Sequence, residues 1–193
     1  MPVQLTDTEQ LFDILSAKTR QDASVVLAID GPCGSGKTTL AQQLQHRLGA
    51  AIIPMDDFFL PQELRTNERY ETPGGNVHYE RFLEEVAPFL RSRNPHSTVS
   101  YRPFDCTLMS YGPVRTVSFS KLTIVEGSYS LHDALRPLYD MRLFLSIDPV
   151  EQERRLRSRV DDERIHAFMQ RWIPLEELYF KNMKPHEHCD YIL

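Results

Sequence analysis

Short apolar runs alternate with amphipathic stretches along this chain. The runs at 24–30, 50–55, 121–127 and 141–148 are predominantly apolar, which is typical of strands buried on both faces. Helical spacing fills the stretches between them, as in YERFLEEVAPFL and LHDALRPLYD. With a final strand in the closing run CDYIL, the pattern predicts an α/β fold: a mostly parallel, five-stranded sheet with helices on both faces.

Two segments depart from this alternation. In residues 1–22, a polar start at Thr6, Asp7 and Thr8 precedes an apolar cluster, which predicts a capped amphipathic helix. Between about 98 and 120, period-two alternation is interrupted by Gly-Pro, which predicts an excursion outside the main sheet. The length of 193 residues, 41% of them hydrophobic, fits a single domain over 1–193.

Composition narrows the class of partner. The formal net charge of −5 argues against binding to nucleic acid or to an anionic membrane, so any anion site must be local. The three cysteines, Cys33, Cys106 and Cys189, are odd in number and far apart, which indicates a reduced intracellular protein. The HEHC run at 186–189 fits no zinc pattern and is read as a surface turn. The N-terminal residues resemble neither a signal peptide nor a membrane anchor, so we expect a cytoplasmic protein.

The segment GPCGSGKT at 31–38 matches the pattern GxxxxGK[ST] in full, between a predicted strand and a predicted helix. Its glycines let successive backbone N–H groups converge on phosphate oxygens, and the helix N-terminus adds positive charge there. Lys37 is expected to act on charge that develops at the transferred phosphate, and Thr38 to bind Mg²⁺. The predicted nucleotide-binding residues of this segment are Gly31, Cys33, Gly34, Ser35, Gly36, Lys37, Thr38 and Thr39.

Carboxylates follow the predicted strands. Asp56 and Asp57 come at the end of the second apolar run, at the sheet edge where ligands bind in open parallel sheets. One of them is a candidate general base beside Mg²⁺, although both could instead cap a loop or helix. Asp148, after another apolar run, is a weaker candidate.

The segments GPCGSGKTT, MDDFF, TIVEG, ERRLRSRV and CDYIL together resemble the uridine kinase and phosphoribulokinase group of P-loop kinases, over nearly the whole chain. Nicotinamide riboside kinases and pantothenate kinases share the same plan. The resemblance implies that Asp56 is the general base and a magnesium neighbour. It also matches Glu126 to the family's Glu-Gly pair, so the implied metal set is Thr38, Asp56 and Glu126.

An arginine cluster occupies the segment at about 154–168. Such a cluster suits a lid that neutralises the transferred phosphoryl group and excludes water, although pairing with nearby acidic residues on a solvated helix accounts for some of the arginines. The resemblance implies that Arg159 meets the acceptor sugar and is catalytic; Arg155 and Arg164 are the predicted phosphate contacts. The segment RVDDERIHAF is shorter than the lid of uridine kinases.

The acceptor side carries fewer signals. Phe58 and Phe59 are predicted to line it. The stretch 71–82 occupies the place of a ribose-binding loop but lacks the family's aspartate and offers Asn76, His78 and Tyr79 instead. YRPFDC resembles a family segment and implies acceptor contacts from Phe104 and Asp105. The run 172–180 predicts a packing helix with Trp172 in the core.

These observations predict a small-molecule kinase that uses ATP and Mg²⁺ and transfers the γ-phosphate to a hydroxyl of a nucleoside-like acceptor. Within this class, the alternative acceptors are nicotinamide riboside, pantothenate or a sugar. In another class, the alternative is a nucleotide-binding regulator without transfer activity, although no NKxD motif or ABC-type signature is present. The sequence leaves homo-oligomerisation open.

Overall fold

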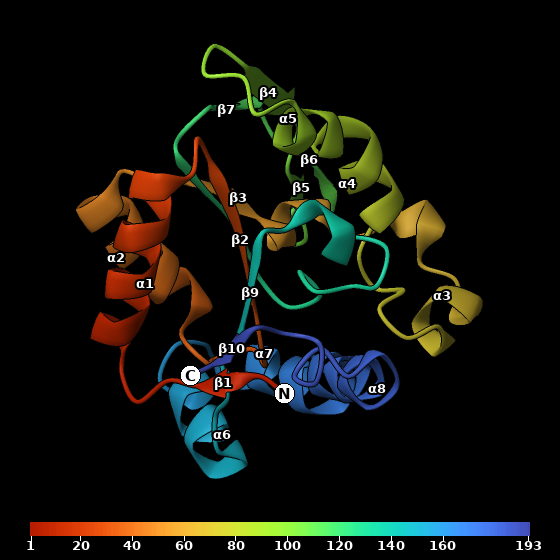
Figure 1. Ribbon diagram of the computed structural model, residues 1–193. Helices are drawn as coiled ribbons and strands as arrows, with labels where there is room; N and C mark the ends of the chain where they lie inside the picture. The colour runs from red at the N-terminus through yellow and green to blue at the C-terminus, as the bar shows by residue number, and fades with distance from the viewer.

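A parallel sheet of six strands forms the centre of the computed structural model, which describes residues 1–193 (Figure 1). The strand order is β1-β10-β9-β2-β8-β3. Five strands were predicted; the sixth is a two-residue edge strand near the N-terminus that pairs with β10, too short to leave an apolar run in the sequence. The strands are β1 (Val3–Gln4), β2 (Val25–Asp30), β3 (Ala51–Pro54), β8 (Leu122–Glu126), β9 (Met141–Phe144) and β10 (Tyr191–Ile192).

The apolar runs are explained by cover on both faces of the sheet. Every residue of β2 and of β8 is buried. Successive side chains of a strand point to opposite faces, so Val26 and Ala28 enter one hydrophobic core while Val25 and Leu27 enter the other. The two cores hold 23 and 16 buried residues. Because both faces of these strands are buried, their sequences are predominantly apolar and do not alternate between apolar and polar residues.

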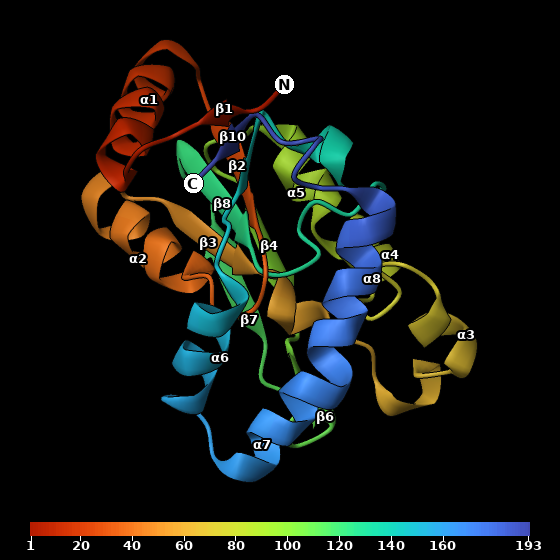
Figure 2. The same cartoon turned by 90° about the horizontal axis from the view of Figure 1, so that it is seen from below.

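Helices from different parts of the chain cover the two faces (Figure 2). The smaller core receives apolar residues from α1 and α2, and the larger receives them from α4, α5 and α8. None of the helices is both long and apolar enough to cross a membrane. The α-helices are α1 (Thr8–Gln21), α2 (Lys37–Leu48), α3 (Asn67–Glu71), α4 (Tyr79–Glu85), α5 (Ala87–Ser92), α6 (Pro149–Arg157), α7 (Asp162–Ala167) and α8 (Ile173–Met183).

The segment 98–120 lies apart from the central sheet. It forms two small antiparallel pairs, β4 (Thr98–Tyr101) with β7 (Arg115–Ser118) and β5 (Phe104–Asp105) with β6 (Ser110–Tyr111). Their placement beside α4 and α5 is visible in Figure 1.

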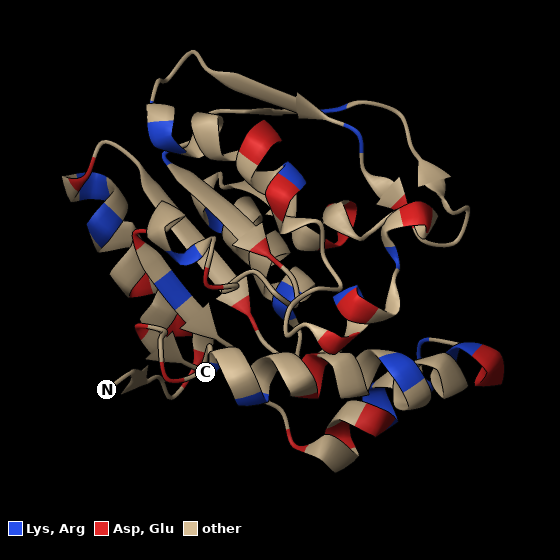
Figure 3. Cartoon of the chain, turned by 90° about the vertical axis from the view of Figure 1, so that its right-hand side faces the viewer, with Lys and Arg blue, Asp and Glu red and all other residues tan.

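The segment after β9 forms α6, α7, a π-helical turn at Phe168–Trp172, and α8. On α6 the acidic residues pair with the arginines: Glu151 contacts Arg154 and Arg155, and Glu153 contacts Arg157. Basic and acidic residues are interspersed over the helices in the view of Figure 3. A π-helical turn within a helical segment is frequent at functional sites.

Candidate functional site

The loop at 31–36 joins β2 to α2 and has the backbone conformation of a phosphate cradle. Gly31, Gly34 and Gly36 have φ angles of 144°, 79° and 102°, which L side chains rarely adopt. At Gly31 a Cβ would lie 2.3 Å from the carbonyl oxygen of Leu145, so close approach to the segment after β9 also requires glycine. The Lys37 ammonium donates to the carbonyl oxygens of Gly31 (2.7 Å) and Pro32 (2.8 Å), and thus lies along the loop.

Strand register brings the predicted acidic residues to this loop. Glu126, the last residue of β8, pairs with Ile29 of β2 on one side and with Pro54 of β3 on the other. Asp56 follows Pro54 by two residues, within the short 3₁₀ helix Met55–Phe58. Because the strands are parallel, all three carboxyl ends meet at one sheet edge.

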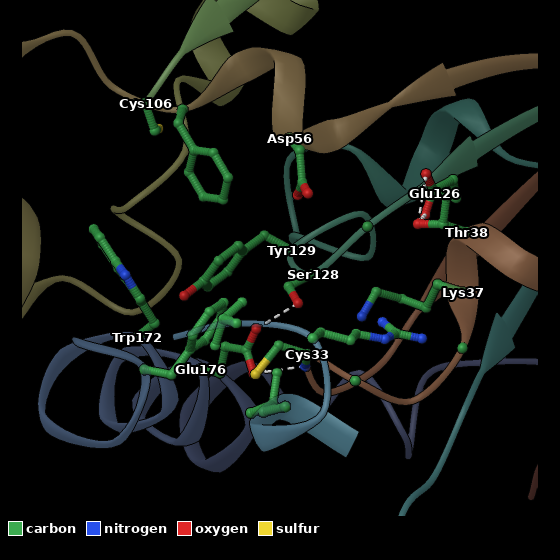
Figure 4. A pocket seen from close by; sticks show the side chains of 18 of the residues that line it. Cys33, Lys37, Thr38, Asp56, Cys106, Glu126, Ser128, Tyr129, Trp172 and Glu176 are labelled. Atoms are coloured by element: carbon green, nitrogen blue, oxygen red, sulfur yellow. Dashed lines mark hydrogen bonds between the residues drawn. The ribbon is translucent and has the colours of Figure 1, made fainter. Parts of the chain in front are cut away.

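A cavity of about 380 Å³ opens at this edge (Figure 4). It is lined by Lys37 and Thr38 from the start of α2, by Asp56 and Glu126 from the strand ends, and by Arg159 after α6. Gly34, Gly36, Cys33, Thr39 and Phe59, also predicted from the sequence, line it as well. These predicted residues therefore surround one space.

The oxygen atoms at the edge of this cavity suit a hard cation. The Thr38 hydroxyl donates to Glu126, at 3.1 Å from Oε2. Burial, and then the nearby charge of Asp56, raise the pKa of Glu126. Two carboxylates and a hydroxyl form the oxygen donor set that Mg²⁺ prefers beside phosphate groups. A bound cation would also offset the repulsion between the two carboxylates, so the residues fit this ion.

The two neighbouring aspartates face different surroundings. Asp56 reaches the cavity, yet the protein atoms packed around its carboxyl raise its pKa, and the charge of Lys37 opposes that effect. Asp57 is buried, and its carboxylate accepts hydrogen bonds from the Tyr101 hydroxyl (2.9 Å) and from Arg115 (2.6 Å). Only Asp56 is available to a molecule in the cavity.

The three arginines predicted at the site, Arg155 and Arg164 as phosphate contacts and Arg159 as the acceptor contact, are placed differently. Arg159 lines the main cavity and also a second cavity of about 510 Å³ on the other side of the loop. Arg155 lines the second cavity and donates to the Gly34 carbonyl oxygen (3.3 Å). Ser35 lines the second cavity too. Arg164 is exposed on α7 and lines neither cavity, because α7 turns it outward from the loop.

Two aromatic residues predicted to contact the acceptor are core residues instead. Phe58, the last residue of the short 3₁₀ helix, is fully buried and packs against Phe82 and Tyr101. The chain leaves this helix in an extended conformation at Phe59, which lines the cavity. Phe104 is buried against Tyr111 in the small β5–β6 pair. Neither Phe58 nor Phe104 lines the cavity.

Three further predicted acceptor contacts lie away from the cavity. Asp105 accepts from the backbone N–H groups of Thr107 and Leu108 and so stabilises a turn. Tyr79 stacks on His132 with ring centroids 4.2 Å apart, and His78 precedes α4 beside it. None of these three lines the cavity.

Asn76, offered by the sequence in the place of the ribose-binding loop, lines the cavity. Several other cavity residues were not predicted as site residues: Cys106, Ser128, Tyr129, Trp172 and Glu176. Trp172, expected in the core, lies half-buried in the π-helical turn and lines the cavity. Glu176 is 5% exposed and accepts from the Cys33 backbone N–H (2.9 Å) and the Ser128 hydroxyl (2.5 Å). Glu176 lies on a helix whose apolar residues have the usual helical spacing, so the local sequence gives no sign of its contact with the phosphate loop.

No protein-family model matches the chain. The fold is nevertheless found in solved structures. A possible uridine kinase from Bacillus stearothermophilus superposes with a TM-score of 0.68 at 22% identity, covering 95% of this chain and 99% of that one. The YFH7 protein of Saccharomyces cerevisiae superposes with the same TM-score at 14% identity, covering 97% and 98%. The fold class is therefore that of the P-loop kinases, as predicted.

Curated proteins give the second comparison. The uridine kinase of Latilactobacillus sakei is 27% identical over 180 residues, covering 88% of this chain and 81% of the relative. Uridine-cytidine kinase D of Dictyostelium discoideum is 28% identical over 151 residues, and uridine-cytidine kinase C is 27% identical over 136. The chain spans 29% and 28% of the length of those two relatives. The predicted resemblance to uridine kinase-like P-loop kinases is confirmed.

Proposed function

We propose that the chain is a MgATP-dependent kinase that transfers the γ-phosphate to a hydroxyl group of a nucleoside-like acceptor. The observation that carries this proposal is the single cavity lined by Lys37, Thr38, Asp56, Glu126 and Arg159. Phosphoryl transfer depends mainly on positioning and on charge neutralisation, and these residues supply both types of group.

Each residue has a role that its position supports. The loop N–H groups and the N-terminus of α2 bind phosphate oxygens, while Lys37 and Arg159 offset charge on the transferred group. Asp56 lines the cavity with Lys37 and Thr38 and accepts the proton of the attacking hydroxyl. Mg²⁺, held by Thr38, Asp56 and Glu126, supplies positive charge beside the phosphate oxygens when bound.

The two cavities suggest how ATP and acceptor share the site. The second cavity, on the Arg155 side of the loop, accommodates the nucleoside part of ATP, and the main cavity accommodates the acceptor next to Asp56. Gly36, Thr39 and Arg159 line both cavities, so the triphosphate passes between them. This arrangement directs the γ-phosphate toward the acceptor.

The test is ADP release from MgATP by the purified protein, measured with nucleosides, nicotinamide riboside, pantothenate and sugars in turn. We expect one acceptor class to stimulate release. Lys37→Ala should lower the stimulated rate by at least about 10²-fold, since the lysine acts on charge in the transition state. The exposed Lys121→Ala is the matched control and should keep the wild-type rate. Near-wild-type turnover in Lys37→Ala would contradict the assignment.

A further inference from the structure

Tyr129, Trp172 and Cys106 line the end of the main cavity farthest from Lys37, with Glu176 between this end and the phosphate loop (Figure 4). Phe59 also lines the cavity. These residues come from four separate segments of the chain. The aromatic rings provide flat apolar surfaces, and the polar groups among them are few, which is the usual make-up of a small-molecule site.

Tyr129 carries the clearest sign of a missing partner. Its side chain is 2% exposed and the residue lines the cavity. Its hydroxyl makes no hydrogen bond of normal geometry, although the side chain of Asn76, which also lines the cavity, lies close to it. Its backbone has a φ of 72°, in the left-handed region that a tyrosine rarely adopts. A buried hydroxyl without a partner is costly, and strained backbone of this kind concentrates at ligand sites.

Glu176 adds a negative charge to the cavity, between its far end and the phosphate loop. Two hydrogen bonds hold its carboxylate, from Cys33 and Ser128. A carboxylate has about four acceptor positions, so roughly two remain for a bound molecule. The carboxylates on the cavity are Asp56, Glu126 and Glu176, and its only Lys or Arg side chains are Lys37 and Arg159.

Both cations are committed to the phosphate side. Lys37 donates to loop carbonyl oxygens, and Arg159 lies where the main cavity meets the second one. No Lys or Arg side chain lines the far end, although Arg65 donates to Cys106 Sγ (3.4 Å) and Arg171 lies 4.9 Å from the centre of the Trp172 ring. Because neither arginine lines the cavity, an acceptor that carries its own carboxylate or phosphate would meet the like charge of Glu176 directly.

We infer that the Tyr129 hydroxyl and the Glu176 carboxylate recognise the acceptor, by hydrogen bonds to the hydroxyl or N–H groups of a neutral or cationic ring-bearing molecule, and that Glu176 excludes anionic acceptors. This inference rests on the proposed kinase function and specifies its substrate class. Trp172 and Phe59 provide the apolar surface against which the ring packs.

The experiment compares phosphoryl transfer from MgATP to uridine (neutral), nicotinamide riboside (cationic) and pantothenate (anionic). The wild-type protein should phosphorylate one of the first two and not pantothenate. Glu176→Gln should raise the KM for that acceptor roughly tenfold and narrow the preference against pantothenate. Because Glu176 also contacts the phosphate loop, the KM for ATP is measured in parallel and should change less than the KM for the acceptor. The exposed neighbour Glu177→Gln is the matched control.

Tyr129→Phe tests the hydroxyl alone. It should raise the acceptor KM roughly tenfold with a small change in the KM for ATP. Tyr139→Phe is its matched control, because Tyr139 also buries a hydroxyl without a partner but lies in the core, outside the cavity.

The outcomes separate the two proposals. Efficient transfer to pantothenate by the wild-type protein, or Glu176→Gln and Tyr129→Phe variants with unchanged acceptor KM, would overturn the inference and leave the kinase function standing. Absence of transfer to every acceptor, with ATP bound, would overturn the kinase function, and the inference would fall with it.

Discussion

Within two pairs of adjacent residues at this site, one side chain lines the cavity and the other is buried in the protein. Asp56 reaches the cavity while Asp57 is tied to Tyr101 and Arg115, and Phe59 lines the cavity while Phe58 is core. The 3₁₀ turn Met55–Phe58 separates the two aspartates, because successive side chains of such a turn point about 120° apart, and the chain leaves the turn in an extended conformation at Phe59. The two members of each pair have the same side chain and differ only in the direction in which that side chain points.

Substitution of the two aspartates separates catalysis from stability. Asp56→Asn should lower the rate of phosphoryl transfer by roughly 10²-fold or more, through loss of the base and of a magnesium contact, with little change in melting temperature. Asp57→Asn should instead lower the free energy of unfolding by roughly 1–3 kcal/mol, because Tyr101 and Arg115 lose a charged partner. Steady-state kinetics and urea unfolding measure the two effects. A larger rate loss in Asp57→Asn than in Asp56→Asn would show that Asp57, and not Asp56, is the base.

At the scale of elements, the junctions between strands and helices define the site. Two other segments contact the phosphate loop. The segment after β9 packs against Gly31 through Leu145, and Glu176 of α8 accepts a hydrogen bond from the backbone N–H of Cys33. The arginines come from α6 and the residues after it. The loop geometry is therefore a property of several packed elements together.

Two glycine substitutions test this dependence. Gly31→Ala places a Cβ against the Leu145 carbonyl in addition to its unfavourable φ, and should lower the free energy of unfolding by roughly 2–4 kcal/mol. Gly49→Ala, at the end of α2, has φ 67° and open space around it, so about 1 kcal/mol is expected. Urea unfolding of both variants measures the difference. Equal losses would show that the contact with Leu145 carries no energetic weight.

At the scale of the whole molecule, Asp30 joins three parts of the fold. Its buried carboxylate accepts from the backbone N–H groups of Gly31 (2.6 Å) and Leu131 (2.7 Å) and from the Tyr179 hydroxyl (2.7 Å). The end of β2, the segment after β8 and helix α8 thus meet at one side chain. Burial is the main cause that raises its pKa from 3.8 to about 6, and the hydrogen bonds oppose it.

This raised pKa predicts a pH dependence of stability. Between pH 3.8 and about 6 the folded protein retains a proton on Asp30 that the unfolded chain has released. The contribution of Asp30 to the free energy of unfolding therefore falls as pH rises through this range, by up to about 3 kcal/mol, and stays constant above it. Urea unfolding of the wild-type protein and of Asp30→Asn should show wild-type stability falling relative to the variant over that range. Parallel curves would contradict the prediction.

The sequence by itself determined the fold class and predicted the phosphate loop. GPCGSGKT is recognisable because its glycines permit the required backbone conformations and a helix N-terminus follows, although packed neighbours hold the loop in place. The family resemblance implied Asp56 and Glu126, and these two residues lie together because the ends of parallel strands share one edge.

Only the tertiary structure decided the acceptor end. Tyr129 and Glu176 lie 47 positions apart on a loop and a helix, and they share a cavity because α8 packs back over the sheet. Conversely, Phe104 and Asp105 have suitable chemistry for a ligand, yet their own small sheet and turn occupy them. Local patterns record periodicity and turn chemistry; they contain no information on which distant side chains share a cavity, because packing between elements sets that arrangement.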